Sequence, residues 1–164
     1  MIMKFEEKEF ITYGHIFDPE KFQEPSNGRR FTMNKPDGGF WASPTESINS
    51  WKDWCLSEDF WGPDKFEVYT KFRFKKSSRI YTIDCVRDLE NLIRSHGKLS
   101  PLFGRCFIDW EKVSKDYDGV YLTAAGSNRC HLSYPHDLNS WDVESVVVLK
   151  QDSIEILEKK NGPA

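Results

Sequence analysis

The run from Lys65 to Lys75 (KFEVYTKFRFK) constrains the fold of this chain more than any other stretch. Apolar and charged residues alternate along it with a period of two, which places them on opposite faces of a strand. A strand with one apolar and one solvated face is typical of antiparallel or mixed sheets. The apolar positions are Phe66, Val68, Phe72 and Phe74, and the charged ones are Glu67, Lys71 and Arg73. The sequence therefore predicts a mostly antiparallel sheet.

Six further runs have the composition of strands, because they are short, rich in β-forming residues and bounded by polar or glycine-containing segments. They are residues 8–16, 39–42, 79–83, 120–122, 143–150 and 153–157. The run 143–150 (VESVVVLK) is the most apolar of them. Two polar stretches, 17–37 and 124–140, predict long loops.

A helix is predicted directly after the strand at 39–42. Ser43 would be its N-cap, Pro44 its first residue and Glu46 the third, which together make a capping box. Its apolar face would hold Ile48, Trp51 and Cys55.

Two more short helices are predicted, at 84–97 and 109–117. Asp84 would cap the first of them, and Gly97 would end it. Their inward faces would hold Val86, Leu89, Leu92, Ile93 and His96, and Trp110, Val113 and Tyr117. The fold class is therefore α+β, with mostly antiparallel strands and about three short helices. At 164 residues without an internal boundary, the chain is expected to form a single domain, 1–164.

Composition limits the classes of partner. Hydrophobic residues make up 38% and charged residues 30%, as in a soluble globular protein. A net charge of −3 argues against a general affinity for nucleic acid, although a local basic groove is compatible with it. No apolar run approaches the roughly 20 residues of a membrane span, and the first residues do not resemble a signal peptide. We expect a cytoplasmic protein without a membrane partner.

The four cysteines are scattered and form no CxxC pair, so reduced and mostly buried thiols are expected. Cys130, His131 and His136 could ligate a metal, but a fourth ligand is not evident. The sequence therefore predicts no metal site.

Three segments hold candidate site residues. His15 follows the first strand, where a structural role is the alternative. Gly39 and Trp41 combine backbone that a ligand can approach closely with a ring that can stack on a planar group. Asp142 and Glu144 enter an apolar strand, where a carboxylate needs an edge position or a partner.

The order of these segments resembles the ADP-ribosyltransferase fold, in poly(ADP-ribose)-polymerase-like and diphtheria-toxin-like members. Gly39-Phe40-Trp41-Ala42 resembles the polymerase Gly-Ile-Tyr-Phe run, and Trp54-Cys55 resembles the Tyr-Cys pair of the next helix. His15 is similar to the family histidine, although this chain has Gly14-His15 where the family has His-Gly. Asp142-x-Glu144 is similar to the Gln/Glu-x-Glu loop of the toxins, and Tyr117-Asp118-Gly119-Val120 to the strand before it. The resemblance implies a split, mostly antiparallel sheet.

It also implies NAD as substrate, with cleavage of the nicotinamide–ribose bond through an oxocarbenium-like state. Glu144 would stabilise the developing positive charge, and Asp142 would lie on the acceptor side. Trp41 would stack on the nicotinamide, with Trp54 or Trp51 opposite.

The remaining implied contacts concern the rest of NAD. Gly39 would bind the carboxamide through its backbone, and His15 the adenosine ribose. Arg29 and Arg30 would pair with the pyrophosphate. Ser43 would either orient Glu144 or only cap its helix.

The resemblance further implies transfer of ADP-ribose to a macromolecular acceptor, either protein or nucleic acid. A bacterial or phage toxin, or a defence component with a neutralising antitoxin protein, would be the context. Two other classes stay open: a non-catalytic binding module of the same fold, and a glycan-cleaving enzyme that uses Asp142 and Glu144 as an acid–base pair. RNA 2′-phosphotransferases share the fold and use NAD, but they rely on several arginines, so the net charge of −3 argues against this function.

Overall fold

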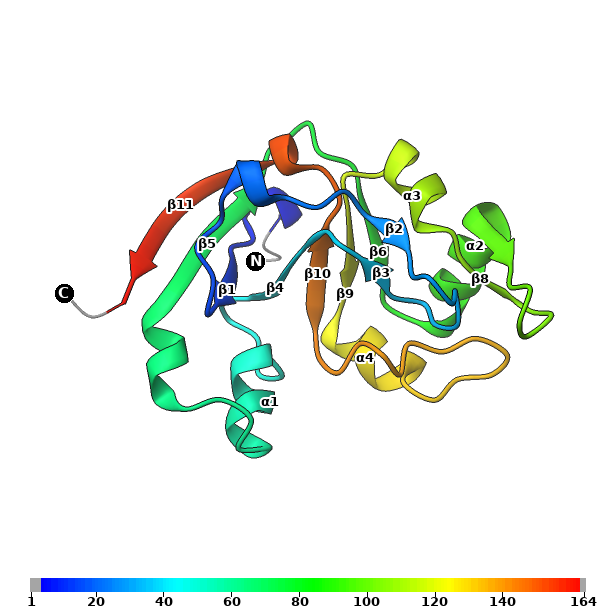
Figure 1. Cartoon of the computed structure of the whole chain (residues 1–164), viewed down its shortest axis with the longest axis horizontal. Helices are drawn as coiled ribbons and strands as arrows, with labels where there is room; N and C mark the ends of the chain where they lie inside the picture. The colour runs from blue at the N-terminus through cyan, green and yellow to red at the C-terminus, as the bar shows by residue number, and fades with distance from the viewer. Residues whose placement is uncertain (1–3, 163–164) are drawn as a thin grey trace.

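The computed structural model describes residues 4–162 and confirms the α+β class. Seven strands form one sheet in the order β11-β5-β1-β4-β10-β9-β6 (Figure 1). All neighbours in it are antiparallel except β6 and β9, which are parallel. The strands are β1 (Phe10–Tyr13), β4 (Phe40–Pro44), β5 (Val68–Phe74), β6 (Ile80–Ile83), β9 (Gly119–Leu122), β10 (Ser145–Val148) and β11 (Ile154–Asn161).

Strand β4 changes partner along its length. Residues 40–42 pair with β10, whereas residues 43–44 pair with β1. The sheet is therefore divided at β4 into a half with β1, β5 and β11 and a half with β10, β9 and β6. In Figure 1 these halves lie on the two sides of β4.

Four α-helices occur among residues 4–162, one more than the sequence predicted: α1 (Trp51–Ser57), α2 (Val86–His96), α3 (Trp110–Asp116) and α4 (Ala124–Cys130). Helix α4 lies in the stretch 124–140 that was predicted to be a loop. Its seven residues include a glycine and a serine, which gave no helical pattern. The segment 17–37 is also not entirely a loop, because β2 (Ser26–Asn27) and β3 (Pro36–Asp37) form a two-stranded sheet there. A second small sheet joins β7 (Gly97–Leu99) and β8 (Cys106–Ile108).

The predicted capping box at Ser43 is wrong. The strand continues through Pro44, and the helix begins seven residues later, where Ser50 and Asp53 form the actual capping box. Ile48, which was expected on the apolar face of the helix, is 93% exposed. Both serines have an acidic residue three positions later, so the pattern alone did not distinguish them.

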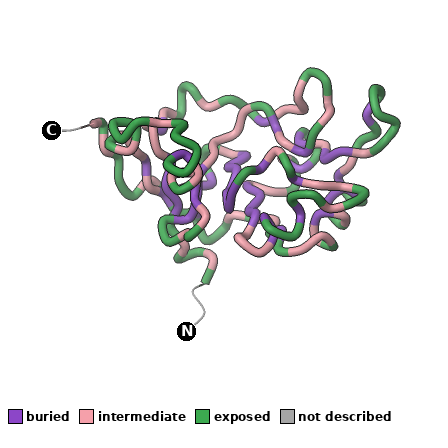
Figure 2. Tube along the Cα trace, turned by 90° about the horizontal axis from the view of Figure 1, so that it is seen from below, coloured by how far each residue is buried: buried purple, intermediate pink, exposed green. Residues whose placement is uncertain are grey.

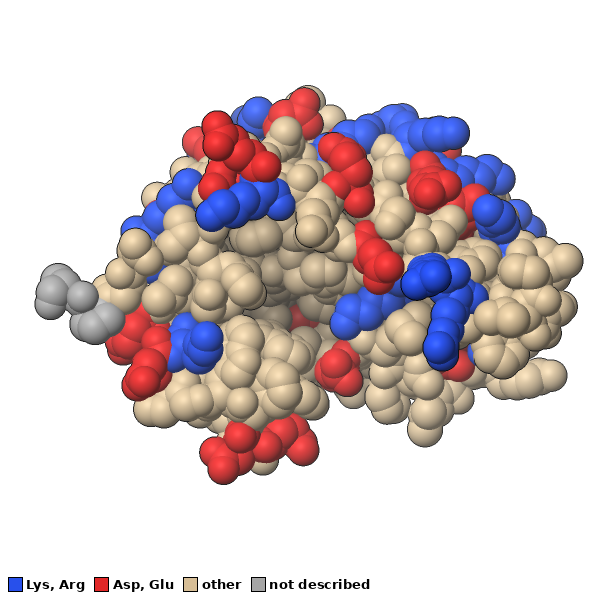
Figure 3. All heavy atoms as spheres, viewed as in Figure 1, with Lys and Arg blue, Asp and Glu red and all other residues tan. Residues whose placement is uncertain are grey.

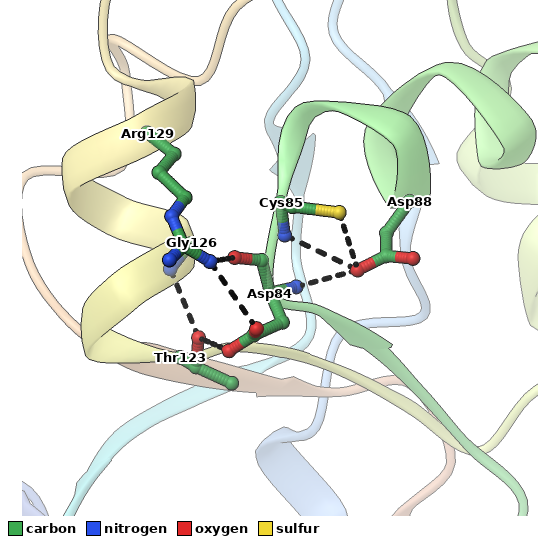
Figure 4. A network of polar contacts seen from close by, with 6 residues as sticks. All are labelled: Asp84, Cys85, Asp88, Thr123, Gly126 and Arg129. Carbon is green, nitrogen blue, oxygen red and sulfur yellow. Dashed lines mark hydrogen bonds and ion pairs between the residues drawn. The ribbon is translucent and has the colours of Figure 1, made fainter.

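Helix α2 begins one residue later than predicted, with Cys85 rather than Asp84 at the N-cap. Asp84 instead connects α2 to α4 (Figure 4). Its carboxylate accepts a hydrogen bond from the Thr123 hydroxyl at 2.7 Å, and its carbonyl accepts one from Arg129 at 3.2 Å. Thr123 is the N-cap of α4, so one aspartate holds two helix starts together.

Two hydrophobic clusters occupy the two faces of β10, which explains why that strand is almost entirely apolar. Val147 belongs to the cluster beneath α2, α3 and α4, and Val146 and Val148 belong to the cluster of phenylalanines from β1 and β5. In Figure 2 the buried segments lie mainly in the interior of the trace and the exposed segments mainly on its outside. No helix among residues 4–162 is long and apolar enough to cross a membrane.

Candidate functional site

A pocket of about 250 Å³ opens where the sheet divides. Strands β1 and β4, the start of β10 and helix α1 form its walls, and Figure 3 shows this face hollowed near its centre. The lining residues include Tyr13, His15, Lys35, Trp41, Ser43, Trp51, Lys52, Trp61, Trp141, Asp142 and Ser145. Three of the predicted segments, carrying His15, Trp41 and Asp142, therefore meet at one pocket.

Tryptophan side chains dominate the pocket walls. The ring of Trp41 meets that of Trp141 edge to face, with 4.7 Å between their centroids. On the other side Trp51 lines the pocket, and Trp54 stacks behind it at 4.8 Å. Trp54 does not itself line the pocket, so Trp51 is the helix ring that faces it. Indole faces are suited to planar, aromatic ligand groups.

Glycine permits the close packing of one of these rings. Gly14 has φ +80°, and a Cβ there would lie 3.1 Å from the Trp61 indole. Only glycine adopts this backbone conformation without cost while leaving room for the ring. The Tyr13-Gly14-His15 turn therefore has a structural role beside any role of the histidine.

Two lysines bring positive charge into the pocket. The Lys35 ammonium lies 5.1 Å from the Trp41 ring centroid, and the Lys52 ammonium lies 5.2 Å from that of Tyr13. Within residues 4–162 neither forms an ion pair. Cations held over aromatic rings without a carboxylate partner remain available to an anionic ligand.

A second hollow of about 370 Å³ adjoins the first, and the two share Thr12, His15 and Trp41. His15 is exposed on the rim between them. Gly39 lines only the second hollow, and its N–H donates to the Gln23 carbonyl at 2.9 Å. The Gly39 N–H therefore already has a partner, and the contact of the Gly39 backbone with a carboxamide stays a prediction.

The Glu144 carboxylate does not line the pocket. It accepts hydrogen bonds from the hydroxyls of Tyr121 and Ser47, and it is 7% exposed. Tyr121 packs in the same cluster as Val146 and Val148, so the Glu144 side chain lies on the opposite face of β10 from Ser145. Burial, followed by the hydrogen bond to Glu144, raises the pKa of Tyr121, so the phenol stays a neutral donor.

Ser43 connects three parts of the site. Its hydroxyl donates to the Glu144 carbonyl at 3.0 Å and accepts the Trp51 N–H, also at 3.0 Å. Two roles were predicted for Ser43, to orient Glu144 or to cap a helix. In the structure it fixes the Glu144 backbone rather than the carboxylate, and it accepts an N–H of the first turn of α1 without being its N-cap.

Arg29 and Arg30 lie outside both hollows, in an exposed turn closed by the Phe31 N–H and the Gly28 carbonyl. The pocket cations are instead Lys35 and Lys52, which sequence reasoning missed. The sequence does not predict which aromatic ring a lysine lies over, because that contact depends on the path of the chain. Trp61 and Trp141 were missed for the same reason. Among the described residues 4–162, His, Cys, Asp and Glu form no cluster of three that could hold a metal ion.

Comparison with known protein families, with curated protein sequences and with solved structures gave no significant match for this chain. The function must therefore be argued from the pocket itself.

Proposed function

We propose that this chain is an NAD-dependent mono-ADP-ribosyltransferase that binds NAD in the pocket between β1, β4, β10 and α1. The observation that carries the proposal is the combination of tryptophan rings, two lysines without carboxylate partners and one carboxylate, Asp142, in a single pocket. Rings suit a nicotinamide or adenine, and lysines suit a pyrophosphate. The adjoining hollow beside His15 gives a dinucleotide room beyond the first pocket.

Size supports a ligand larger than a single ring. The first hollow measures about 250 Å³ and the second about 370 Å³. Together they fall in the range of roughly 300–1,000 Å³ usual for small-molecule and cofactor sites. Nicotinamide would lie between Trp41 and Trp51, and the remainder would extend past His15.

The reaction breaks the bond between the nicotinamide nitrogen and ribose C1, and the bonding electron pair leaves with nicotinamide. Positive charge then develops on the ribose, and a carboxylate nearby stabilises it. Asp142 lines the pocket and takes this role in our proposal, while Glu144 acts as a positioning residue for the start of β10. An acceptor nucleophile on protein or nucleic acid then bonds to C1 and loses its proton.

A second function, a nucleotide-binding module without turnover, is favoured by one observation. The Glu144 carboxylate, which the resemblance implies to be catalytic, is bound by Tyr121 and Ser47 and faces away from the pocket. Under this alternative the chain binds NAD and releases no nicotinamide.

The test is incubation with NAD labelled separately in its nicotinamide and adenylate parts. Nicotinamide release measures cleavage, and adenylate label on lysate protein or nucleic acid measures transfer. We expect Asp142→Asn to lower nicotinamide release by about 10²–10³, as removal of one electrostatic partner of a transition state does. Asn139→Asp is the control, since it changes charge in the same exposed loop outside the pocket lining.

Binding of NAD without release in the wild type would establish the binding module. Release that persists in Asp142→Asn but disappears in a folded Glu144→Gln would exchange the roles of the two carboxylates. Absence of NAD binding would refute both functions.

A further inference from the structure

The β7–β8 end of the molecule carries an exposed apolar surface that the pocket does not use. Three segments form it and contact one another: the Phe31 ring lies 5.7 Å from that of Phe107, and the Asn34 amide donates to the Asp137 carbonyl at 2.9 Å. In Figure 1 the β8 hairpin and the loop after α4 extend to the same side. The exposed side chains are Met33, Leu99, Leu102, Phe103, Leu132 and Tyr134. Apolar side chains grouped in this way mark interaction sites more often than isolated ones do.

This apolar surface is surrounded by positive charge. Glu90 and Asp137 occur near it, Asp37 lies against Gly28 beside Arg29, and Arg105 lies over the Phe107 ring at 4.9 Å. The basic residues are Arg29, Arg30, Arg94, Lys98 and Arg105, all exposed, and none is ion-paired within residues 4–162. We name these apolar and basic residues together the basic end.

The basic end is also hollowed. A depression of about 360 Å³ lies between the hairpin and the loop after α4, lined by Ile93, Arg94, Cys106, Pro135 and His136 among others. A hollow of this kind accepts a protruding side chain, which a flat lipid surface does not offer. Four of the six exposed apolar side chains are aliphatic and offer no planar face to a nucleic-acid base, whereas Phe103 and Tyr134 are aromatic. The surface therefore fits a protein that is apolar and acidic.

Such a surface exists on the same molecule, around α1. Ile48, Leu56 and Phe60 are exposed there, at 93%, 55% and 57%. Acidic side chains surround them, with Lys52 and Lys65 as the basic exceptions: Glu46, Asp53, Glu58, Asp59 and Asp64. We name this surface the acidic end. Figure 3 shows Asp and Glu below the hollow, around α1, and Lys and Arg to its right with some Asp and Glu among them.

We propose that the basic end of one copy docks on the acidic end of a second copy. Opposite charges around two apolar surfaces attract and orient the partners. The two surfaces are different, so the contact is heterologous, and every added copy leaves one free surface of each kind. Assembly therefore continues beyond a dimer into chains or rings.

Docking also affects the pocket. Trp51 and Lys52 of α1 line the pocket while the other side of α1 belongs to the acidic end. A docked copy lies beside the pocket opening, which gives assembly a route to regulate access of the ligand.

The experiment is sedimentation velocity of the full chain from 5 to 200 µM, at 50 mM and 500 mM NaCl. The wild type is expected to form species larger than a dimer at low salt and to dissociate at high salt. A basic-end variant (Lys98→Glu with Arg105→Glu) and an acidic-end variant (Glu58→Lys with Asp64→Lys) should each associate at least tenfold more weakly. Lys75→Glu with Lys76→Glu, in the turn between β5 and β6, is the matched charge-reversal control and should assemble like the wild type.

Mixing the two end variants gives the decisive result. Each variant retains one intact end, so a 1:1 mixture should associate at concentrations at which neither variant associates alone. A wild type that stays monomeric at 200 µM and 50 mM NaCl would overturn the proposal. The proposal would also be overturned if the control variant associated as weakly as the end variants, or if the mixture of the end variants stayed monomeric.

Discussion

Replacement of Glu144 tests whether its carboxylate holds the structure together or acts on a ligand. The carboxylate is 7% exposed and accepts hydrogen bonds from two neutral donors, the hydroxyls of Tyr121 and Ser47. Glu144→Gln retains a carbonyl acceptor and a similar shape but loses the charge that strengthens both bonds. We expect a loss of about 1–2 kcal/mol in the free energy of unfolding, since a hydrogen bond to a charged group is worth about 1 kcal/mol more than a neutral one.

Glu144→Ala leaves the buried Tyr121 hydroxyl and the partly buried Ser47 hydroxyl without their acceptor. A buried, unsatisfied polar group costs about 1–3 kcal/mol, so the loss should be at least about 1–3 kcal/mol from Tyr121 alone. For a domain of this size, 1 kcal/mol lowers the melting temperature by about 2–4 °C. Thermal and urea unfolding of both variants would measure these losses, with nicotinamide release followed in parallel.

A double-mutant cycle with Tyr121→Phe isolates the phenol–carboxylate contact. If the contact exists, the losses from Tyr121→Phe and Glu144→Gln should not add, and the interaction energy should reach about 1 kcal/mol. Unchanged stability in both single variants and additive behaviour in the double variant would refute the network. A stable Glu144→Gln without NAD cleavage, together with an Asp142→Asn that retains cleavage, would identify Glu144 as the reacting carboxylate.

Three other outcomes are expected. Trp41→Ala should weaken NAD binding by about 1–3 kcal/mol, the usual worth of base–aromatic stacking, measured by titration against the tryptophan fluorescence of the remaining rings. Gly39→Ala should destabilise the fold by about 2 kcal/mol or more, because φ is +72° and its Cβ would lie 2.7 Å from Val147 Cγ2, whereas Gly62→Ala, with open space around it, should be near neutral in the same urea unfolding. Burial lowers the pKa of His136 in the folded protein. The unfolded chain therefore binds the proton first, near the ordinary pKa of 6.5, and the free energy of unfolding should fall as the pH drops below that value. His136→Gln should reduce this pH dependence of the urea midpoint between pH 7.5 and pH 5.

The strands and helices with strong periodicity could be predicted from the sequence, and their boundaries less well. The alternation at 65–75 identified β5, although residues 63–67 form a 3₁₀ helix before it. The spacing at 84–97 identified α2 because Leu89, Leu92 and Ile93 repeat on one face. Helix α4 was missed since its burial comes from small residues, including Gly126, whose Cβ would lie 2.2 Å from the Ile83 carbonyl.

Residue types in the sequence indicated three segments of the pocket, but the contacts that bring them together depend on tertiary structure. His15, Trp41 and Asp142 line one pocket because β1 and β10 are both neighbours of β4. The direction of the Glu144 side chain follows from the two-residue period of a strand, which places it on the face opposite Ser145. That period was visible in the sequence, but which face meets the pocket depends on the pairing of β10 with β4. The ring beneath Lys35 depends on the path of a loop, and the ring beneath Lys52 depends on how α1 lies against β1, so no periodicity in the sequence predicts either pair.

The change of partner along β4 connects the fold to the pocket. Up to Ala42 the strand pairs with β10, and from Ser43 it pairs with β1, so its two neighbours separate at this point. Separation of strands leaves backbone groups that need other partners. Ser43 supplies one, because its hydroxyl bonds the Glu144 carbonyl and the Trp51 N–H together. A single buried serine thus fixes the start of β10 and the start of α1 to each other at the place where the sheet is interrupted.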